Sequence, residues 1–368
     1  MGAPTIAIVG SGPSGCYIAQ FLRKAFPEAD LTIFDRLKVP YGLVRFGVAP
    51  DHTGTKAVSQ QFDRLFDRDG VKFIGNTEIG KDKSLQDLRR ENEIVVLATG
   101  LSEDRNLAIA GEELSGVYGS GRITRLINGH PDEKLDGIEI GLNIAIVGHG
   151  NVAMDLIRLS LLRPEELQSF GVSKETAELI ANPNIESISI VGRSGIENAK
   201  FDIAMVKELG KIPEVRFTSD AITPTNMDAD TQKRIDAINE LTSKSPINAK
   251  RTVNFHFGWS PKAITGNEKV TGITFMSSSA TLNLAVDTVY SAIGFQEART
   301  ASLKRDEYSS AEVDLERGYL ATGLYCVGWL RRGPRGTIPA NRADAKLVCD
   351  SIVNDFNEKL NDGQKINE

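Results

Sequence analysis

Two glycine-rich turns in this chain have a residue spacing that suits nucleotide chemistry. Residues 10–15 read G-S-G-P-S-G, and residues 148–153 read G-H-G-N-V-A. Each follows an apolar run and precedes a helical pattern, which is the context that a dinucleotide-binding turn requires. The glycines permit a tight turn and a close approach of the backbone to a pyrophosphate at the helix N-terminus. A turn that binds nothing is the alternative for either one. Two such turns in one chain predict two nucleotides, and hence transfer between them.

A charged side chain follows the first strand expected after each turn. Asp35 comes after the apolar run 31–34, where a carboxylate binds the ribose hydroxyls of an adenosine, although it could instead cap a turn. Arg193 comes after the run 188–191, where an arginine accommodates the 2′-phosphate of NADP, although it could be a solvated turn residue. The neighbouring Ser194 would add a hydroxyl to that phosphate site. These positions favour NADP at the second turn.

Residues 38–52 form a long segment with apolar side chains but no helical or strand period. Such a segment after a nucleotide-binding unit is more often a site loop than a linker. His52 ends the segment, and taken alone it is more readily a structural histidine than a catalytic one. Gly100 closes an A-T-G sequence after the run 94–97, where a glycine lets the chain pass close to the first nucleotide.

The elements that must position these residues follow from the hydrophobic periods. A helix should run from about residue 15 to residue 26, another should begin at 151, and residues 164–184 are helical in pattern and rich in capping residues. We expect strands at 6–9, 31–34, 71–74, 94–97, 142–147, 188–191 and 324–327. The runs 253–257, 270–276 and 288–292 predict an antiparallel layer that completes the second domain, and the last of them should return the chain to the first domain.

Composition limits the possible classes of protein. The length of 368 residues favours two domains, and 40% hydrophobic with 25% charged residues is typical of a globular protein in water. A net charge of −6 argues against a general nucleic-acid binder. No apolar run reaches membrane-spanning length, and the first strand starts too early to leave room for a signal or transit peptide. The three cysteines are far apart without C-x-x-C, which predicts a cytoplasmic protein with no redox disulfide and no cysteine metal site. The four scattered histidines predict no metal cluster either.

The C-terminal part combines a glycine-rich turn, residues 328–336, with a helical pattern from Ile338. N–H groups at such a helix start can stabilise negative charge, for example on a reduced flavin ring. Cys349 falls on the apolar face of the helix together with Ala345, Val348, Ile352 and Phe356, so its spacing predicts a core position. We expect the polar tail after Phe356 to fray.

Four motifs together resemble the adrenodoxin reductase family of NADPH–ferredoxin reductases. They are V-G-S-G-P-S-G, V-P-Y-G-L-V-R-F-G-V-A-P-D-H, G-H-G-N-V-A-M-D and G-W-x-x-R-G-P-x-G, and the resemblance covers nearly the whole chain. It implies a glutathione-reductase-like fold with FAD at the first turn and NADPH at the second. Electrons would leave singly to a [2Fe–2S] ferredoxin. Because the chain lacks C-x-x-C, they cannot pass through an internal disulfide and must reach an external acceptor.

The resemblance also implies roles for particular residues. The expected FAD residues are Gly10, Gly12, Pro13, Ser14, Gly15, Asp35, Leu43, Gly100, Trp329, Gly336, Thr337 and Ile338. The expected NADP residues are Gly148, Gly150, Asn151, Val152, Arg193, Ser194 and Gly333. His52 and Asp155 match a pair that the family places near the flavin, where it would assist electron or proton transfer. Without the resemblance, Asp155 would be an ordinary carboxylate in the first turn of a helix.

The expected fold is α/β, with two Rossmann-like nucleotide-binding domains built on parallel sheets with antiparallel additions. An FAD domain over 1–104 and 296–368 would be interrupted by an NADP domain over 105–295. The chain resembles a shortened member of the family. It has Arg193-Ser194 where the family usually has two adjacent arginines, which leaves NADPH preference open.

Two alternatives to a ferredoxin reductase remain. The same architecture could use NADH or reduce a flavodoxin, a quinone or another small acceptor. The chain could also be an electron-transfer subunit that binds nucleotides without turnover. Cations in residues 210–269, at 233, 234, 244, 250, 251 and 262, could form a docking face for an acidic protein or a solvated surface. No docking residue can be matched to the family.

Overall fold

The computed structural model describes residues 3–220, 224–299 and 301–365. The chain divides into two compact units. Unit 1 comprises Met1–Val48, His52–Glu103 and Phe295–Glu368, and unit 2 comprises Ala49–Asp51 and Asp104–Gly294. The three-residue piece of unit 2 thus interrupts the first stretch of unit 1.

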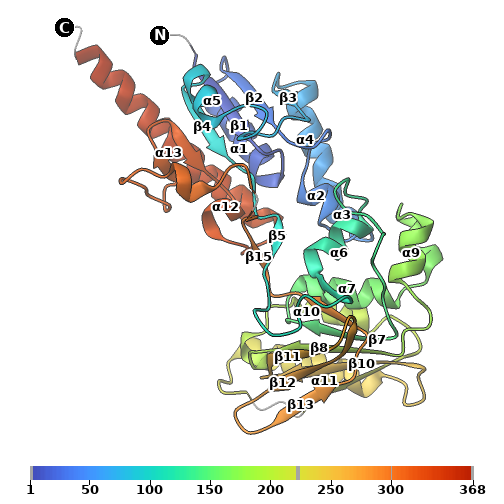
Figure 1. Cartoon of the computed structure of the whole chain (residues 1–368). Helices are drawn as coiled ribbons and strands as arrows, with labels where there is room; N and C mark the ends of the chain where they lie inside the picture. Colours follow the sequence, from blue (N-terminus) through green and yellow to red (C-terminus); the bar gives the residue numbers. More distant parts are fainter. Residues whose placement is uncertain (1–2, 221–223, 300, 366–368) are drawn as a thin grey trace. The chain divides into compact units, whose positions relative to one another are not determined.

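Unit 1 is built on a six-stranded sheet in the order β16-β17-β4-β1-β2-β3. Its strands β4, β1, β2 and β3 are labelled in Figure 1. All neighbours from β17 to β3 are parallel, and β16 is antiparallel to β17. The strands are β1 (Thr5–Val9), β2 (Asp30–Phe34), β3 (Lys72–Ile74), β4 (Ile94–Leu97), β16 (Tyr319–Ala321) and β17 (Leu324–Cys326).

Helices cover both faces of this sheet, because its central strands are apolar on both sides. Ile6 and Ile8 of β1 share a core cluster with Leu22 of the first helix, whereas Ala7 and Val9 pack with residues of α5 on the other face. Helix α1 also packs along α13. The helices are α1 (Pro13–Ala25), α2 (Leu43–Phe46), α3 (Thr53–Lys56), α4 (Val58–Asp67), α5 (Leu85–Glu91), η2 (Arg305–Tyr308), α12 (Trp329–Arg332) and α13 (Ile338–Lys365).

Unit 2 has its own six-stranded sheet, in the order β6-β14-β7-β8-β10-β9, and all of its neighbours are parallel. A separate antiparallel sheet of β11, β12 and β13 belongs to the same unit. The strands are β6 (Val117–Gly119), β7 (Asn143–Val147), β8 (Ser187–Gly192), β9 (Val215–Ser219), β10 (Arg251–Phe257), β11 (Ser260–Gly266), β12 (Val270–Met276), β13 (Thr281–Leu284) and β14 (Thr288–Ser291). Short strands β5 (Glu103–Asp104) and β15 (Phe295–Gln296) pair where the chain passes between the units.

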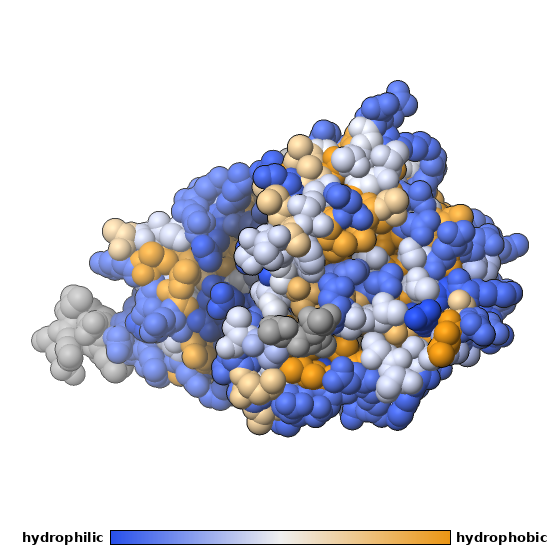
Figure 2. Space-filling model, turned by 90° about the horizontal axis from the view of Figure 1, so that it is seen from below, coloured by the Kyte–Doolittle hydropathy of each residue, from blue (hydrophilic) through white to orange (hydrophobic). Residues whose placement is uncertain are grey.

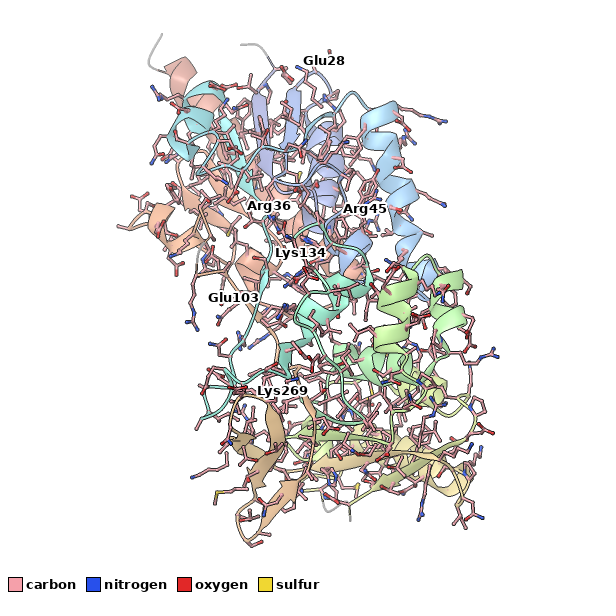
Figure 3. The ribbon with its side chains drawn as sticks, turned by 45° about the vertical axis from the view of Figure 1, so that its right-hand side comes forward. Glu28, Arg36, Arg45, Glu103, Lys134 and Lys269 are labelled. Carbon is pink, nitrogen blue, oxygen red and sulfur yellow. The ribbon has the colours of Figure 1, made fainter. Side chains whose placement is uncertain are left out.

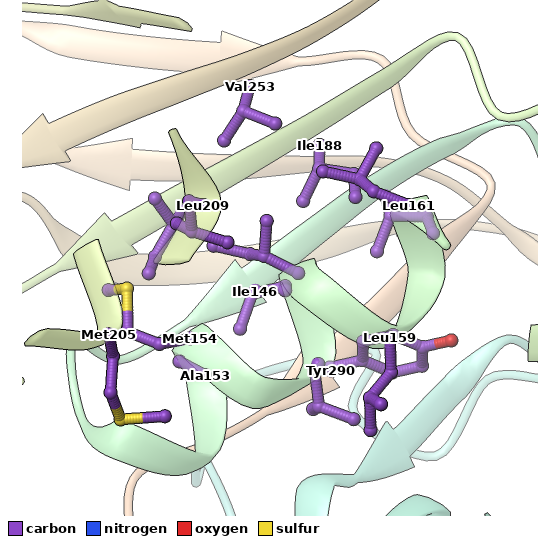
Figure 4. Packing of buried hydrophobic residues seen from close by; sticks show 14 of the residues in the cluster. Ile146, Ala153, Met154, Leu159, Leu161, Ile188, Met205, Leu209, Val253 and Tyr290 are labelled. Atoms are coloured by element: carbon purple, nitrogen blue, oxygen red, sulfur yellow. The ribbon is translucent and has the colours of Figure 1, made fainter. Parts of the chain in front are cut away.

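The core of unit 2 lies between its parallel sheet and the helices α7 and α10. Ile146 of β7 and Ile188 of β8 are fully buried, and Met154 and Leu209 of the helices pack against them (Figure 4). Tyr290 of β14 closes the same cluster. The helices are α6 (Ser120–Ile127), α7 (Asn151–Leu161), α8 (Pro164–Ser169), α9 (Lys174–Ile180), η1 (Ile196–Asn198), α10 (Ile203–Leu209) and α11 (Ala229–Lys244).

Three sequence-based expectations about elements need correction. The runs 253–257 and 288–292 belong to the parallel sheet as β10 and β14, and only 270–276 lies in an antiparallel layer. Both runs are buried strands whose partners are distant in sequence, so local pattern could not give their direction. Helix α13 continues past Phe356 to Lys365 instead of fraying. The segment 38–52 contains the short helix α2.

The surface of the described residues is mixed in character. The face in Figure 2 shows hydrophobic patches separated by hydrophilic side chains. Figure 3 labels the cations Arg45 and Lys269. The Lys269 ammonium lies 2.5 Å from the Glu139 carboxylate, and the Arg45 guanidinium lies 5.6 Å from the ring centre of Tyr41. Within the described residues we find no helix with the length and apolar character that a membrane crossing needs.

Candidate nucleotide-binding sites

The sheet of unit 1 brings four loops to one edge. Because β1, β2, β4 and β17 are parallel, the segments that follow them meet at the carboxyl edge of the sheet, where open α/β sheets bind ligands. Those segments begin at Gly10, Asp35, Ala98 and Val327. Four segments that are separated in the sequence, all predicted to contact the first nucleotide, therefore share one edge.

The first glycine turn is shaped by close backbone contacts. Gly10 has φ +105°, and a Cβ there would lie 2.5 Å from the carbonyl oxygen of Ala98. A Cβ on Gly15 would collide with the carbonyl oxygen of Gly10. Gly12, by contrast, is the N-cap of α1 and has no atom within 4 Å of a built Cβ. Two of the glycines are therefore needed for packing, whereas Gly12 faces open space.

Pro13 occupies the first turn of α1, where the missing N–H of proline costs no helix hydrogen bond. Ser14, the next residue, lies close to Gly328. A Cβ on Gly328 would collide with the Ser14 hydroxyl. The start of α1 thus lies directly beside the turn after β17, so two expected FAD segments are adjacent in unit 1.

Asp35 fills the place of a turn-capping residue. One carboxylate oxygen accepts from the backbone N–H of Ser11 (2.8 Å) and from its hydroxyl (2.5 Å), and the other accepts from the N–H of Leu37 (2.8 Å). These are the contacts of the capping alternative, and they hold the first turn against the end of β2. Ribose recognition by Asp35 stays a prediction.

The segment after β2 lies over the first turn. The N–H of Tyr41 donates to the carbonyl of Ser11 (3.0 Å), and a Cβ on Gly42 would be 2.9 Å from the Cα of Gly12. Tyr41 has φ +88° and is buried, and its hydroxyl bonds to Asp63. Leu43 begins α2 immediately after these residues. A strained non-glycine conformation that persists is held by surrounding contacts, which is common at binding sites.

The turn after β17 is held by a buried carboxylate. Asp344, 4% exposed, accepts from the N–H of Gly328 (2.6 Å) and pairs with Arg331 and Arg332. Trp329 stacks on Phe295 with 5.4 Å between ring centres. The expected residues Gly333, Gly336 and Thr337 lie between α12 and α13, and Ile338 is the first residue of α13.

Two observations in unit 1 fit the FAD that the sequence predicts. The N-terminus of α1 has open space at Gly12, which is what a pyrophosphate needs to approach the backbone. The indole Nε1 of Trp329 is buried and has no hydrogen-bond partner among the described residues. A buried donor without a partner costs free energy, so an acceptor from a ligand would satisfy it. The residues present fit an FAD.

The second glycine turn repeats this geometry in unit 2. Gly148 has φ +122° and a Cβ there would collide with the carbonyl of Ala292, whereas Gly150, the N-cap of α7, is open. Asn151 is held by Asp202, whose carboxylate accepts from its amide (2.6 Å) and whose N–H donates to its oxygen (2.8 Å). Val152 follows in the first turn of α7. The open helix N-terminus fits a second dinucleotide.

The loop after β8 contains both a cation and a carboxylate. Arg193 and Ser194 are exposed at the carboxyl edge of the sheet, as a 2′-phosphate site requires. Glu197 follows in η1, where one carboxylate oxygen accepts from Thr225 (2.7 Å) and the other is buried without a hydrogen-bond partner among the described residues. A carboxylate near this loop opposes a phosphate dianion, so the loop contains features for and against NADP.

His149 in the second turn is a packing residue. It is 8% exposed, its ring centre lies 4.5 Å from that of Phe257, and a Cβ on Gly192 would collide with its imidazole. Burial lowers the pKa of His149 to about 4, so the ring is neutral at pH 7. It therefore adds no charge to the nucleotide site.

The expected pair His52 and Asp155 is divided between the units. His52, in unit 1, is the N-cap residue of α3, and its carbonyl accepts from Thr55 and Lys56. Asp155, in unit 2, lies beyond the first turn of α7, which corrects the sequence interpretation. Its carboxylate is 2.8 Å from Arg158. A joint role of His52 and Asp155 stays a prediction.

Other predicted features can be compared directly with the described residues. All three cysteines are free and buried, Cys349 among them in the α13 face, and no metal-binding group of side chains occurs within the described residues. Of the cations in residues 210–269, Lys233 and Lys244 pair with carboxylates of their own helix, and Arg234 and Arg251 donate to backbone carbonyls. These internal partners favour the solvated-surface interpretation.

Sequence reasoning missed the buried Arg158 and the residues around it. The signal was available, because an arginine in the apolar run M-D-L-I-R-L-S-L-L cannot be buried alone. Its partners Asp51 and Glu208 are far away in sequence, so pattern could not name them.

Two parallel-sheet units, each with an open glycine turn, define an α/β architecture with two candidate dinucleotide sites. Residues 8–63 match the NAD(P)-binding Rossmann-like domain. The fold is shared with thioredoxin reductase from Lactococcus lactis, at 15% identity and a TM-score of 0.58 over 96% of this chain and 99% of that one. The predicted α/β fold class is confirmed.

Relatives with higher identity identify the family. Cindoxin reductase from Citrobacter braakii is 44% identical over 96% of this chain and 78% of its own length. The mitochondrial NADPH:adrenodoxin oxidoreductase of Arabidopsis thaliana is 32% identical over 96% of this chain and 82% of its own length. The structure of Mycobacterium tuberculosis FprA in complex with NADPH superposes with a TM-score of 0.89 at 28% identity, covering 98% of this chain and 86% of that one. This chain belongs to the adrenodoxin reductase family of ferredoxin–NADP reductases.

Proposed function

We propose that this protein is an FAD-dependent ferredoxin–NADP⁺ reductase. It takes electrons from NADPH and passes them one at a time to a ferredoxin-type [2Fe–2S] protein. The observation that carries the proposal is the repeated open helix N-terminus, at Gly12 in unit 1 and at Gly150 in unit 2. Membership of the adrenodoxin reductase family supports the choice of FAD, NADPH and ferredoxin.

Unit 1 would be the FAD domain and unit 2 the NADP domain. In unit 1 the N-terminus of α1 would hold the FAD pyrophosphate, and the buried Nε1 of Trp329 would donate to an acceptor on the cofactor. When bound, FAD supplies the conversion of one two-electron hydride transfer into two single-electron steps. The turns after β4 and β17 would exclude water from the site, and the N–H groups of residues 336–338 would stabilise negative charge there.

Unit 2 would bind and orient the nicotinamide nucleotide. The N-terminus of α7, from Gly150 to Val152, would hold its pyrophosphate, and Arg193 with Ser194 would hold the 2′-phosphate. His52 and Asp155 would assist electron or proton transfer near the flavin. The free and buried cysteines support a reducing, cytoplasmic location.

Anaerobic reduction tests this function directly. The purified protein should show a flavin spectrum that bleaches with NADPH, and it should then reduce cytochrome c only when a ferredoxin is added. A flavodoxin or a quinone in place of the ferredoxin tests the alternative acceptors. A protein without flavin, or with flavin that NADPH cannot reduce, would exclude the proposal. If the protein binds nucleotides but does not reduce a dye acceptor, it would instead be a nucleotide-binding subunit without turnover.

NADH is the second candidate donor, and Glu197 is the observation that favours it. Its carboxylate shares the loop of Arg193 and opposes the 2′-phosphate that only NADPH carries. The ratio of kcat/KM for NADPH to that for NADH decides between them. Arg193→Ala should lower this ratio by about tenfold or more, because a charge-assisted hydrogen bond is lost. Glu197→Gln should raise the ratio. Arg216→Ala, at an exposed position in β9, is the control. An equal fall of the NADPH-to-NADH ratio in Arg193→Ala and Arg216→Ala would exclude a specific role for Arg193.

A further inference from the structure

A buried arginine in unit 2 collects three carboxylates from three separate segments. The Arg158 side chain is 6% exposed. Its Nε and Nη2 lie 2.7 and 2.9 Å from the two oxygens of Asp51, and Nη2 also lies 2.8 Å from Asp155. Its Nη1 lies 3.4 Å from Glu208 of α10. The contact with Asp51 is bidentate, which fixes orientation as well as distance.

This cluster is poorly suited to a purely stabilising role. One cation faces three carboxylates, and removal of charges from water costs free energy that mutual attraction often fails to recover. A well-packed apolar side chain at 158 could join the surrounding core with no such cost, since Leu156, Ile157 and Leu159 are already buried there. A planar guanidinium is, however, well suited to hold separate carboxylates at fixed positions.

The segment held by Arg158 is Ala49–Asp51, the three residues of unit 2 that stand between two stretches of unit 1 in the sequence. Ala49 is 1% exposed and belongs to the apolar core of unit 2, and Asp51 is anchored by the guanidinium. His52 follows at once, and it is the residue expected to assist electron or proton transfer. The other member of that expected pair, Asp155, contacts the same guanidinium.

We propose that Arg158 is a positioning residue for both members of this pair. It would hold Asp155 directly, and it would hold the backbone that leads into His52 through Asp51. The inference rests on the proposed function, because the roles of His52 and Asp155 are part of that function. It adds a residue that neither the sequence motifs nor the nucleotide-binding turns point to.

The test measures the rate of flavin reduction by NADPH, per bound FAD, in the full-length protein. Arg158→Gln removes the charge and leaves the carboxylates to repel one another, so the rate should fall by about tenfold or more, since small misplacements at a reacting site are costly. Binding of NADP⁺ should change little, because the pyrophosphate and 2′-phosphate sites are not altered. Arg158→Lys keeps the positive charge but loses the bidentate guanidinium contact with Asp51. Its rate should lie between that of the unaltered protein and that of Arg158→Gln.

A matched control separates positioning from loss of stability. Arg125 lies in the same unit, its side chain is 19% exposed and its Nε lies 2.7 Å from Glu133. Arg125→Gln should lower the melting temperature without changing the rate per FAD. The double variant Arg158→Gln, Asp51→Asn removes one of the repelling carboxylates and should recover part of the lost rate.

The outcomes distinguish the inference from the proposed function. If the unaltered protein is reduced by NADPH but Arg158→Gln and Arg125→Gln give equal rates per FAD, Arg158 has no positioning role and the proposed function still stands. If Arg158→Gln loses bound FAD but keeps an unchanged rate per bound FAD, the residue acts on stability and the inference is wrong. If NADPH does not reduce the unaltered protein, the proposed function itself fails.

Discussion

Individual charged residues in this protein hold turns and loops in place from buried or half-buried positions. Asp344 ties the turn after β17 to α13, Asp35 ties the first glycine turn to the end of β2, and Arg158 ties residue 51 to α7. In each case a carboxylate accepts from backbone N–H groups or pairs with arginine, as buried charges require. The candidate sites therefore depend on polar anchors as well as on glycines.

His52 gives a prediction at the scale of one residue. His52→Gln should keep FAD bound, because no nucleotide-binding turn is altered, but flavin reduction or electron exit should slow by about tenfold or more if the imidazole moves a proton. Stopped-flow reduction by NADPH and steady-state transfer to a ferredoxin measure the two steps. Unchanged kinetics at full FAD content would leave His52 as a structural residue.

At the scale of elements, substitutions in the first glycine turn can distinguish an effect on FAD binding from an effect on folding stability. Gly12 has an extended backbone (φ −65°, ψ −179°) and free space at its Cβ, so Gly12→Ala should change folding stability by no more than about 1 kcal/mol. It should still weaken FAD binding, since the pyrophosphate can no longer approach. Gly15→Ala collides with the Gly10 carbonyl and should cost at least about 1–3 kcal/mol.

Flavin content and thermal unfolding of the two variants, measured side by side, check this prediction. Gly12→Ala with full FAD affinity would support a turn that binds nothing. Gly150→Ala, which has the same open geometry in the second turn, should leave FAD bound and weaken NADP⁺ instead.

The second turn predicts a pH dependence of the stability of unit 2. Burial lowers the pKa of His149 from 6.5 to about 4, so between these values the unfolded chain binds a proton that the folded unit does not. Stability is therefore lost as the pH falls from 6.5 to 4, by about 3 kcal/mol from this residue. His149→Phe keeps a ring against Phe257 and should flatten the dependence.

Urea unfolding followed by the fluorescence of Trp259, in a Trp329→Phe background, reports on unit 2 because the chain has two tryptophans. Measurements at pH 7 and pH 4.5 give the difference for each variant. If the protein with His149 and the His149→Phe variant lose the same stability between pH 7 and pH 4.5, other groups cause the acid dependence.

For the whole molecule, charge sets a prediction about partner docking. The net charge of this protein is −6, so an acidic ferredoxin would be repelled by most of its surface. Such a partner must therefore dock at a local region of positive charge. Ferredoxin-dependent reduction of cytochrome c should therefore fall as ionic strength rises, because salt screens exposed charges. Reduction of a neutral dye by the same sample is the control and should change little. Equal salt dependence with and without ferredoxin would argue against electrostatic docking.

Much of the architecture was accessible from sequence because its signals are local. The two glycine turns, the strands at 94–97 and 270–276 and the buried face of α13 with Cys349 depend on residue types within a few positions of one another. The turn spacing and the family motifs also predicted the nucleotides. Local chemistry thus determined what the elements are and which class of ligand they suit.

Tertiary structure decided everything that depends on partners far away in the chain. The direction of β10 and β14, the capping of the first turn by Asp35 and the three carboxylates around Arg158 all join residues separated by many positions. A buried charge or an apolar strand shows in sequence that it needs a partner, but the fold alone selects the partner. The sequence by itself therefore determined the chemistry of this protein, and the folded chain decided how its side chains are held.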